Sequence, residues 1–212
     1  MSDISFLTLV KTVHIIGAGT NMDRPAHKAF GDMEGRGYRM VPVHPRDAGS
    51  TIHGRPIVPH PWSSEDPDLF VLFVSPDRTL GLLREWLISG RRIPFIWLQP
   101  GAEREDVVTF LEDAGIPYSA GKCWVVTSLE NNLYCQDPLP SVPWALQTTS
   151  IDGDECSVWN LFPAGTDHSI NAPLEWVGDL FDLETSNEPV PRYIRSLVQH
   201  GETLEQAALR LS

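Results

Sequence analysis

The chain has 212 residues, of which 42% are hydrophobic, so it can bury a large core in one domain and still carry an extension. No apolar run reaches the roughly 18 residues that a membrane-spanning helix needs, and no cleavable leader is recognisable, so we expect a cytoplasmic protein. The net charge of −12 includes −9 from residues 137–212, and this acidity argues against nucleic acid or a membrane as partner.

Strand and helix patterns alternate over about the first 125 residues. A buried strand is expected at Val13–Ile16, and a helix from Pro25 to Gly35, with proline in its first turn and glycine at its end. Further strands are expected at Tyr38–Val43, Leu69–Val74, Phe95–Leu98 and Ile116–Ser119, and helices at Asp77–Ser89, with Asp77 as N-cap, and Glu103–Ala114. This succession predicts an α/β fold, a Rossmann-like, doubly wound and mostly parallel five-stranded sheet.

The pattern changes after Asn132, where prolines at 138, 140 and 143 indicate a linker or an extended wrap. An irregular, partly helical extension is expected to follow. Its expected elements are a strand at Cys156–Phe162 and helices at Leu174–Leu183, Tyr193–His200 and Thr203–Leu211, the last with a Thr203–Gln206 capping box. We therefore expect a Rossmann-like domain at residues 1–136 and an acidic C-terminal extension at 137–212 that packs on it.

The loop after the first strand has the composition of a phosphate-binding turn. Gly17 and Gly19 flank Ala18, and glycines let a phosphate approach the backbone at the start of the next helix. The residues that follow add hydrogen-bond donors, namely Thr20, Asn21, Arg24 and His27. The alternative interpretation is a tight strand-to-helix turn that binds no ligand.

Two features argue against a dinucleotide in this loop. Met22 stands where the dinucleotide fingerprint has its third glycine, and the second strand ends in His44-Pro45 rather than in an acid for the ribose. The chain also has no G-x-x-x-x-G-K-[ST] sequence, which argues against ATP bound through a P-loop.

A series of short motifs occurs in order along residues 10–126. They are Ile16-Gly17-Ala18-Gly19 with Arg24-Pro25-Ala26-His27, Gly37-Tyr38-Arg39 leading into Val41-Pro42-Val43-His44-Pro45, Ile52-His53-Gly54-Arg55-Pro56-Ile57-Val58, and Trp97-Leu98-Gln99-Pro100-Gly101-Ala102. In this order they resemble the small CoA-binding proteins related to the N-terminal domain of the succinyl-CoA synthetase alpha subunit. The chain departs from that family at Gly19, where serine is common, at His44, where asparagine is usual, and at Pro100.

The resemblance implies that the ligand is coenzyme A or an acyl-CoA, and it assigns residues by position. The diphosphate would face Gly17, Ala18, Gly19 and Arg24. The adenosine would border Val43, His44 and Pro45. Ser75, Pro76 and Arg78 would line the next loop, and Gln99 and Gly101 the pantetheine side.

The sequence shows no catalytic or metal-binding constellation. No Ser/His/acid arrangement or ligand cluster is recognisable, and Cys123 is a lone cysteine at a strand end. Related synthetases carry a phosphohistidine domain, for which residues 137–212, with His168 and His200, are too short and irregular. We therefore expect a non-catalytic carrier, sensor or regulatory protein.

Two alternatives stay open at this point. The first is an NAD(P)-binding oxidoreductase or redox sensor on the same fold. The second is a protein–protein interaction module with a vestigial nucleotide crevice, whose C-terminal extension binds a partner. Homodimer formation is also left open by the sequence.

Overall fold

The computed structural model describes residues 4–150 and 156–212. The chain forms two compact units, and each is built from two separate stretches of sequence. Unit 1 comprises Met1–Met40 and Asp66–Leu139, and unit 2 comprises Val41–Glu65 and Pro140–Ser212.

A five-stranded parallel sheet is the centre of the α/β fold, with strand order β2-β1-β5-β6-β7. Its strands are β1 (Thr12–Ile16), β2 (Arg39–Val43), β5 (Leu69–Leu72), β6 (Phe95–Leu98) and β7 (Tyr118–Ser119), and the division between the units falls within β2. Strand order reverses between β1 and β5, which pair in parallel from Val13 opposite Leu69. The predicted Rossmann-like, doubly wound sheet is thereby confirmed.

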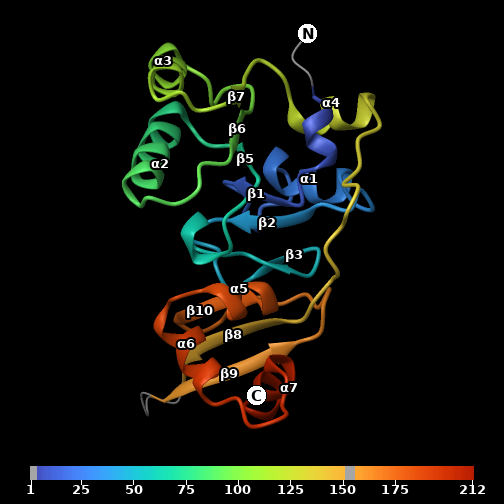
Figure 1. Cartoon of the computed structure of the whole chain (residues 1–212), viewed down its shortest axis with the longest axis vertical. Coiled ribbons are helices and arrows are strands. Elements are labelled where there is room, and N and C mark those ends of the chain that lie inside the picture. The colour runs from blue at the N-terminus through green and yellow to red at the C-terminus, as the bar shows by residue number, and fades with distance from the viewer. Residues whose placement is uncertain (1–3, 151–155) are drawn as a thin grey trace. The chain divides into compact units, whose positions relative to one another are not determined.

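Four helices connect or flank the strands of unit 1. They are α1 (Pro25–Asp32), α2 (Pro76–Ile88), α3 (Glu105–Asp113) and α4 (Trp124–Glu130), and a 3-10 turn at Ser5–Thr8 precedes β1. In Figure 1, α2 and α3 lie on one side of this sheet and α1 and α4 on the other. The expected N-cap at Asp77 is wrong: Ser75 is the N-cap, because Pro76 occupies the first helical position. Helix α4 was not expected from the sequence.

The core of unit 1 follows from strands that are apolar on both faces. All four residues of β5 are fully buried, as a parallel sheet covered by helices on both sides requires. Trp86 of α2 packs edge-on against Phe70 of β5, with ring centroids 4.8 Å apart. Tyr38, the residue before β2, contacts Trp124 of α4. Burial raises the pKa of the Tyr38 phenol to about 12.

Asp68 holds the beginning of β1 beside the beginning of β5. Its carboxylate accepts hydrogen bonds from the backbone N–H groups of Lys11, at 2.9 Å, and Thr12, at 3.1 Å, and it pairs with Arg92 at 3.1 Å. Burial by itself raises the pKa of Asp68, but these donors outweigh it, so the net pKa is lowered. The carboxylate therefore stays charged where the two strands start.

Unit 2 contains a three-stranded antiparallel sheet, in the order β10-β8-β9. Its strands are β8 (Trp144–Thr149), β9 (Ser157–Phe162) and β10 (Leu174–Asp179), and its helices are α5 (Leu180–Thr185), α6 (Pro189–Ser196) and α7 (Leu204–Arg210). Residues 41–65 add the small hairpin of β3 (Thr51–Ile52) and β4 (Arg55–Pro56) and a 3-10 turn at Pro61–Ser63. Strand β9 and the Thr203–Gln206 capping box agree with the sequence predictions.

The helix expected at Leu174–Leu183 is wrong over most of its length, because Leu174–Asp179 form β10 and helix α5 begins only at Leu180. Trp176 joins the core of unit 2, while Glu175, at the bulge between Leu174 and Trp176, stays exposed. Glu175 accepts hydrogen bonds from Gln147 and Ser157, and these bonds lower its pKa. Pairing with β8 therefore decides the conformation of a segment whose apolar spacing also suits a helix.

One buried carboxylate joins the two stretches of unit 2. Asp182 is 2% exposed and accepts hydrogen bonds from the Ser64 hydroxyl, at 2.6 Å, and from the Glu65 backbone N–H, at 3.0 Å. It also shares a reciprocal capping box with Asp179 at the start of α5. Residues 41–65 are thereby tied to the C-terminal sheet.

We predict that Asp182→Ala lowers the free energy of unfolding by about 2–4 kcal/mol, because it removes the buried acceptor of the Ser64 hydroxyl and the Glu65 N–H and the N3 half of the α5 capping box. Chemical denaturation of the full chain measures this change. Glu184→Ala, an exposed change on the same helix, is the control and should stay within about 0.5 kcal/mol of the original protein. Equal effects of the two substitutions would contradict the role of Asp182.

Candidate functional site

The candidate site of unit 1 lies at the carboxyl ends of β1, β5 and β6. The loop Gly17–Thr20 follows β1, Ser75 and Pro76 lead into α2 after β5, and Gln99 follows β6 directly. These strands are neighbours in the parallel sheet, and its topological switch point falls between β1 and β5. Ligands of doubly wound sheets bind at such a point, so the fold brings these three predicted segments to one edge.

Gly17 lets the loops after β1 and β5 approach closely. It has φ of +96°, and a Cβ at this position would lie 3.0 Å from Val74 Cγ1 and 3.1 Å from the Phe73 carbonyl oxygen. The adjoining backbone is held by a 2.9 Å hydrogen bond from the Phe73 N–H to the Ile16 carbonyl. Glycine is therefore required by both backbone conformation and space.

Two helices begin beside this switch point without side-chain caps. Arg24 is the N-cap of α1 and Ser75 that of α2, and neither side chain caps its helix. Both helices have proline at the first position, so their first backbone N–H groups belong to Ala26 and Asp77. Uncapped helix N-termini carry unpaired donors and the positive end of the helix dipole. This arrangement suits an anionic group.

Two side chains near the first loop bind its backbone, and two others are exposed to solvent. His27 Nδ1 lies 2.9 Å from the Gly19 carbonyl oxygen, so Nδ1 carries a proton and donates it to that carbonyl. The Asn21 side chain accepts from the Asp23 N–H at 3.0 Å. Thr20 and Arg24 are exposed to solvent at the loop, where they can reach a ligand.

Met22 is 73% exposed, so its side chain does not stand between helix and sheet. The third glycine of the dinucleotide fingerprint serves close packing of those two elements. The absence of that glycine is therefore weaker evidence against a dinucleotide than the sequence suggested.

The end of β6 contributes a buried amide. Gln99 is 3% exposed, and its Nε2 has no hydrogen-bond partner among the residues that the structure describes. Its backbone carbonyl accepts from the Ala102 N–H at 2.8 Å, closing a turn in which Gly101 has φ of +94°. A buried unpaired donor is costly, so Gln99 is a candidate to bind an acceptor-rich ligand.

The sequence did not single out an ion-paired residue that joins two of these loops. Arg104, the N-cap of α3, contacts Asp77 in the first turn of α2 and Asp106 in its own helix, each at 2.7 Å. The hydrogen bonds from Arg104 to Asp106 and Asp77 raise the pKa of its guanidinium. The contact between Arg104 and Asp77 could not be predicted because the two residues are far apart in the sequence. Thr79, whose buried hydroxyl lacks a partner within the described chain, was likewise missed.

Arg78 and the end of β2 complete the set of predicted residues. Arg78 is exposed in the first turn of α2, near the loop it was assigned to. Val43, His44 and Pro45 belong to unit 2, where Val43 bridges to Val58 and the His44 N–H donates to the Val58 carbonyl at 3.0 Å. His44 Nδ1 also lies 3.3 Å from Asp47 Oδ2.

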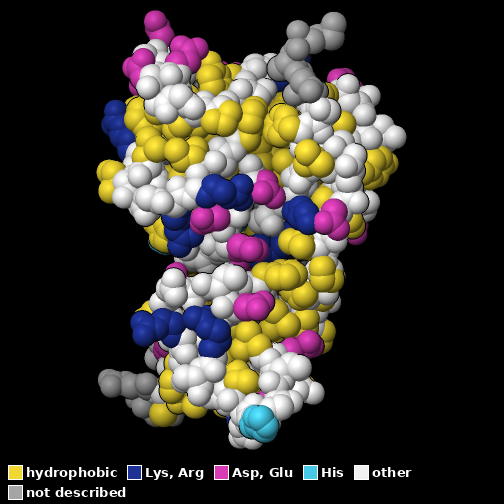
Figure 2. All heavy atoms as spheres, in the orientation of Figure 1, with side chains coloured by type: hydrophobic (Ala, Val, Ile, Leu, Met, Phe, Trp, Pro, Cys, Tyr) yellow, Lys and Arg dark blue, Asp and Glu magenta, His cyan; other side chains and the backbone are white. Residues whose placement is uncertain are grey.

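In the view of Figure 2, many of the Lys and Arg side chains lie close to Asp or Glu side chains. Over residues 4–150 and 156–212, no group of three or more His, Cys, Asp or Glu side chains is arranged to hold a metal ion. No helix in those ranges is both long and apolar enough to cross a membrane.

Comparison with known proteins agrees with this architecture. A family model described as CoA binding domain matches residues 11–128, more than half of the chain. The chain belongs to this CoA binding domain family.

Several solved structures are similar to part of the chain. A Thermus thermophilus protein is 31% identical with a TM-score of 0.53, and the match covers 59% of this chain and 92% of that one. A conserved hypothetical protein from Pyrococcus furiosus is 30% identical with a TM-score of 0.49, over 55% and 98% of the two chains. A hypothetical protein from Pyrococcus horikoshii, 21% identical with a TM-score of 0.51 over 59% and 86%, shares the fold.

We predict that Gly17→Ala lowers the free energy of unfolding by about 1–3 kcal/mol, because alanine strains the backbone at positive φ and crowds Val74. Gly81→Ala is the matched control, since Gly81 lies within α2 and a Cβ there meets no atom within 4 Å. This control should stabilise by about 0.5–1 kcal/mol. Thermal and urea unfolding report both values, and a neutral Gly17→Ala would contradict the required close approach.

Proposed function

We propose that the protein binds coenzyme A or an acyl-CoA through the strand ends of unit 1, as a non-catalytic carrier, sensor or regulatory protein. The observation that carries the proposal is the membership of residues 11–128 in the CoA binding domain family. The glycine loop at the switch point supports it, because that is where such a sheet accepts a nucleotide.

The diphosphate is assigned to the two uncapped helix starts. A diphosphate between α1 and α2 would accept from backbone N–H groups beside Gly17 and Gly19, and the exposed Arg24 and Arg78 supply opposite charge. In this proposal Gln99 donates its unpaired amide to a carbonyl of the pantetheine arm. The expected adenosine contacts of Val43, His44 and Pro45 rest on the resemblance alone, and these residues are left out of the site proposed for unit 1 because they belong to unit 2.

An NAD(P)-binding protein is the second candidate. The exposed position of Met22 favours this candidate, because the Met22 side chain does not prevent the close helix–sheet packing that the dinucleotide fingerprint requires. The absence of an acid at His44 remains the argument for CoA, since NAD uses an acid there for its ribose hydroxyls.

We predict that CoA stabilises the full chain, because a ligand that binds only the folded state shifts unfolding by mass action. At 100 times its dissociation constant a ligand adds about 2.7 kcal/mol. Thermal unfolding with CoA, acetyl-CoA, NAD, NADP and ATP in parallel measures this. A shift with NAD or NADP but none with CoA or acetyl-CoA would replace the proposal by the second candidate. No shift with any of them would favour an interaction module with a vestigial crevice.

We predict that Arg24→Ala weakens CoA binding by about tenfold or more, the loss of one charge-assisted hydrogen bond to phosphate. Titration calorimetry measures the affinity. Lys28→Ala is the control, because Lys28 is an exposed cation one helical turn further along α1 and is not assigned to the site. Equal affinities of the original protein and Arg24→Ala would remove Arg24 from the diphosphate site.

A further inference from the structure

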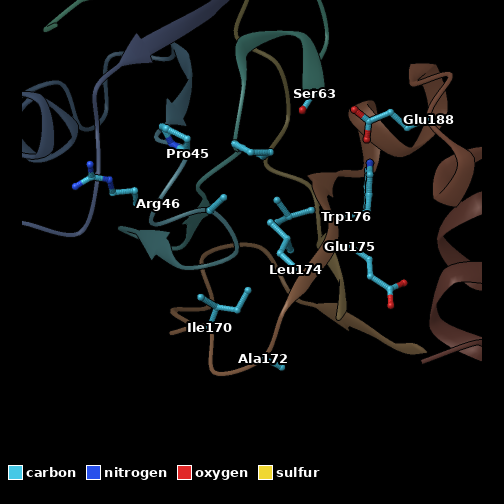
Figure 3. A pocket seen from close by; sticks show the side chains of 12 residues that line it. Pro45, Arg46, Ser63, Ile170, Ala172, Leu174, Glu175, Trp176 and Glu188 are labelled. Atoms are coloured by element: carbon cyan, nitrogen blue, oxygen red, sulfur yellow. The ribbon is translucent and has the colours of Figure 1, made fainter. Parts of the chain in front are cut away.

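A second pocket lies entirely within unit 2 and plays no part in the proposed CoA site. It has a volume of about 400 Å³, within the range of small-ligand and short-peptide sites. One wall is formed by four consecutive residues of β10, from Leu174 to Val177 (Figure 3). The facing wall comes from residues 45–63, and Ile170 and Ala172 close one end.

Two residues after the bulge show that the pocket lies along the edge of the sheet. Trp176 and Val177 are consecutive in the regularly paired part of β10 and point to opposite faces of the strand, yet both line the pocket. A cavity above one face would contact only one of them. Strand β10 is the outer strand in the order β10-β8-β9 and pairs with β8 along one edge. Its other edge carries backbone N–H and C=O groups that no strand of the described chain pairs with.

The facing wall cannot complete the sheet. Pro45 and Pro59 stand on it, and proline has no backbone N–H to donate to a neighbouring strand. The segment 41–65 is instead joined to residues 140–212 by bonds that are not part of a β-ladder, such as the 2.8 Å hydrogen bond from the Gly54 N–H to the Asp167 carboxylate. A slot therefore remains between the edge of β10 and a proline-bearing wall.

Polar groups in this slot match a peptide bond. Trp176 is 3% exposed, and its indole N–H has no acceptor among the described residues. The nitrogen-bearing end of its ring lies on the side of Glu188, which also lines the pocket (Figure 3). An amide group can accept from the indole N–H and donate to a carboxylate, whereas a simple ammonium or carboxylate ion can do only one of these.

Charge indicates which peptides fit best. Unit 2 carries 13 acidic and 5 basic side chains, a net charge of −8, and Glu188 is a half-buried carboxylate of the slot. Glu175 also lines the pocket, and the Arg46 guanidinium points away from Trp176 (Figure 3). A basic side chain next to the paired segment is therefore favoured.

We propose that this slot binds an extended, basic peptide segment of another protein, which adds as a strand to the free edge of β10. The bulge between Leu174 and Trp176 limits regular pairing to a few residues, so the segment is short. Its backbone pairs with β10, one amide spans Trp176 and Glu188, and an apolar side chain packs against Leu174 and Ile170.

The test uses the full chain and an array of acetylated, amidated pentapeptides of varied sequence. A matched array carries N-methyl groups at alternate amides, which blocks strand pairing. We expect binding by peptides that combine alternating apolar residues with Lys or Arg, and at least a tenfold loss on N-methylation. The best peptide should also slow amide hydrogen exchange in β10. The proposal would be overturned if no peptide bound more tightly than its N-methylated counterpart.

Substitutions in the slot test whether the peptide binds there. Trp176→Phe and Glu188→Gln should each weaken the best peptide about tenfold, the effect of one buried hydrogen bond. Trp159→Phe is the control for Trp176, because Trp159 stacks on it in the same core but does not line the slot. Glu184→Gln is the control for Glu188. The proposal would be overturned if Trp176→Phe and Glu188→Gln both left the affinity unchanged. It would also be overturned if the single-residue compound N-acetylvaline amide bound while none of the peptides did.

Discussion

The close approach of Gly17 to the Phe73–Val74 backbone is the constraint on which the candidate site depends. It allows the loops after β1 and β5 to meet where the strand order reverses. Because Phe73 and Val74 cannot recede without breaking the bond to Ile16, the loop geometry belongs to the sheet itself. His27 then fixes the far side of the loop through the Gly19 carbonyl. The shape of the Gly17–Thr20 loop is thus set by backbone contacts, and the exposed Arg24 adds charge beside it.

The sequence was sufficient for the elements whose signals are local. Strand β6 was predicted with the bounds that the structure has, because Phe95–Leu98 is a short apolar run between prolines. The capping box at Thr203 and Gln206 is equally local. Segments that depend on distant partners were not predictable in this way. Strand β8 follows a run of prolines, and β10 became a strand only through its pairing with β8.

The candidate site shows the same division. The glycine loop and the Gln99–Gly101 turn could be located because parallel strands place their carboxyl ends together. The protonation of His27 Nδ1, the unpaired amide of Gln99 and the contact between Arg104 and Asp77 could not, since each depends on distances between side chains. The pocket beside β10 was equally hidden, because it combines residues 45–63 with 170–188.

The interleaving of the two units has a consequence for how the chain can be shortened. Residues 41–65 lie inside the sequence matched by the family model, yet their partners include Asp167 and Asp182 near the other end of the chain. Removal of residues 140–212 would therefore leave Ser64 and Gly54 without the carboxylates that hold them. The C-terminal region is a structural component of this segment rather than a detachable tail, and recombinant boundaries drawn at the linker would divide one folding unit.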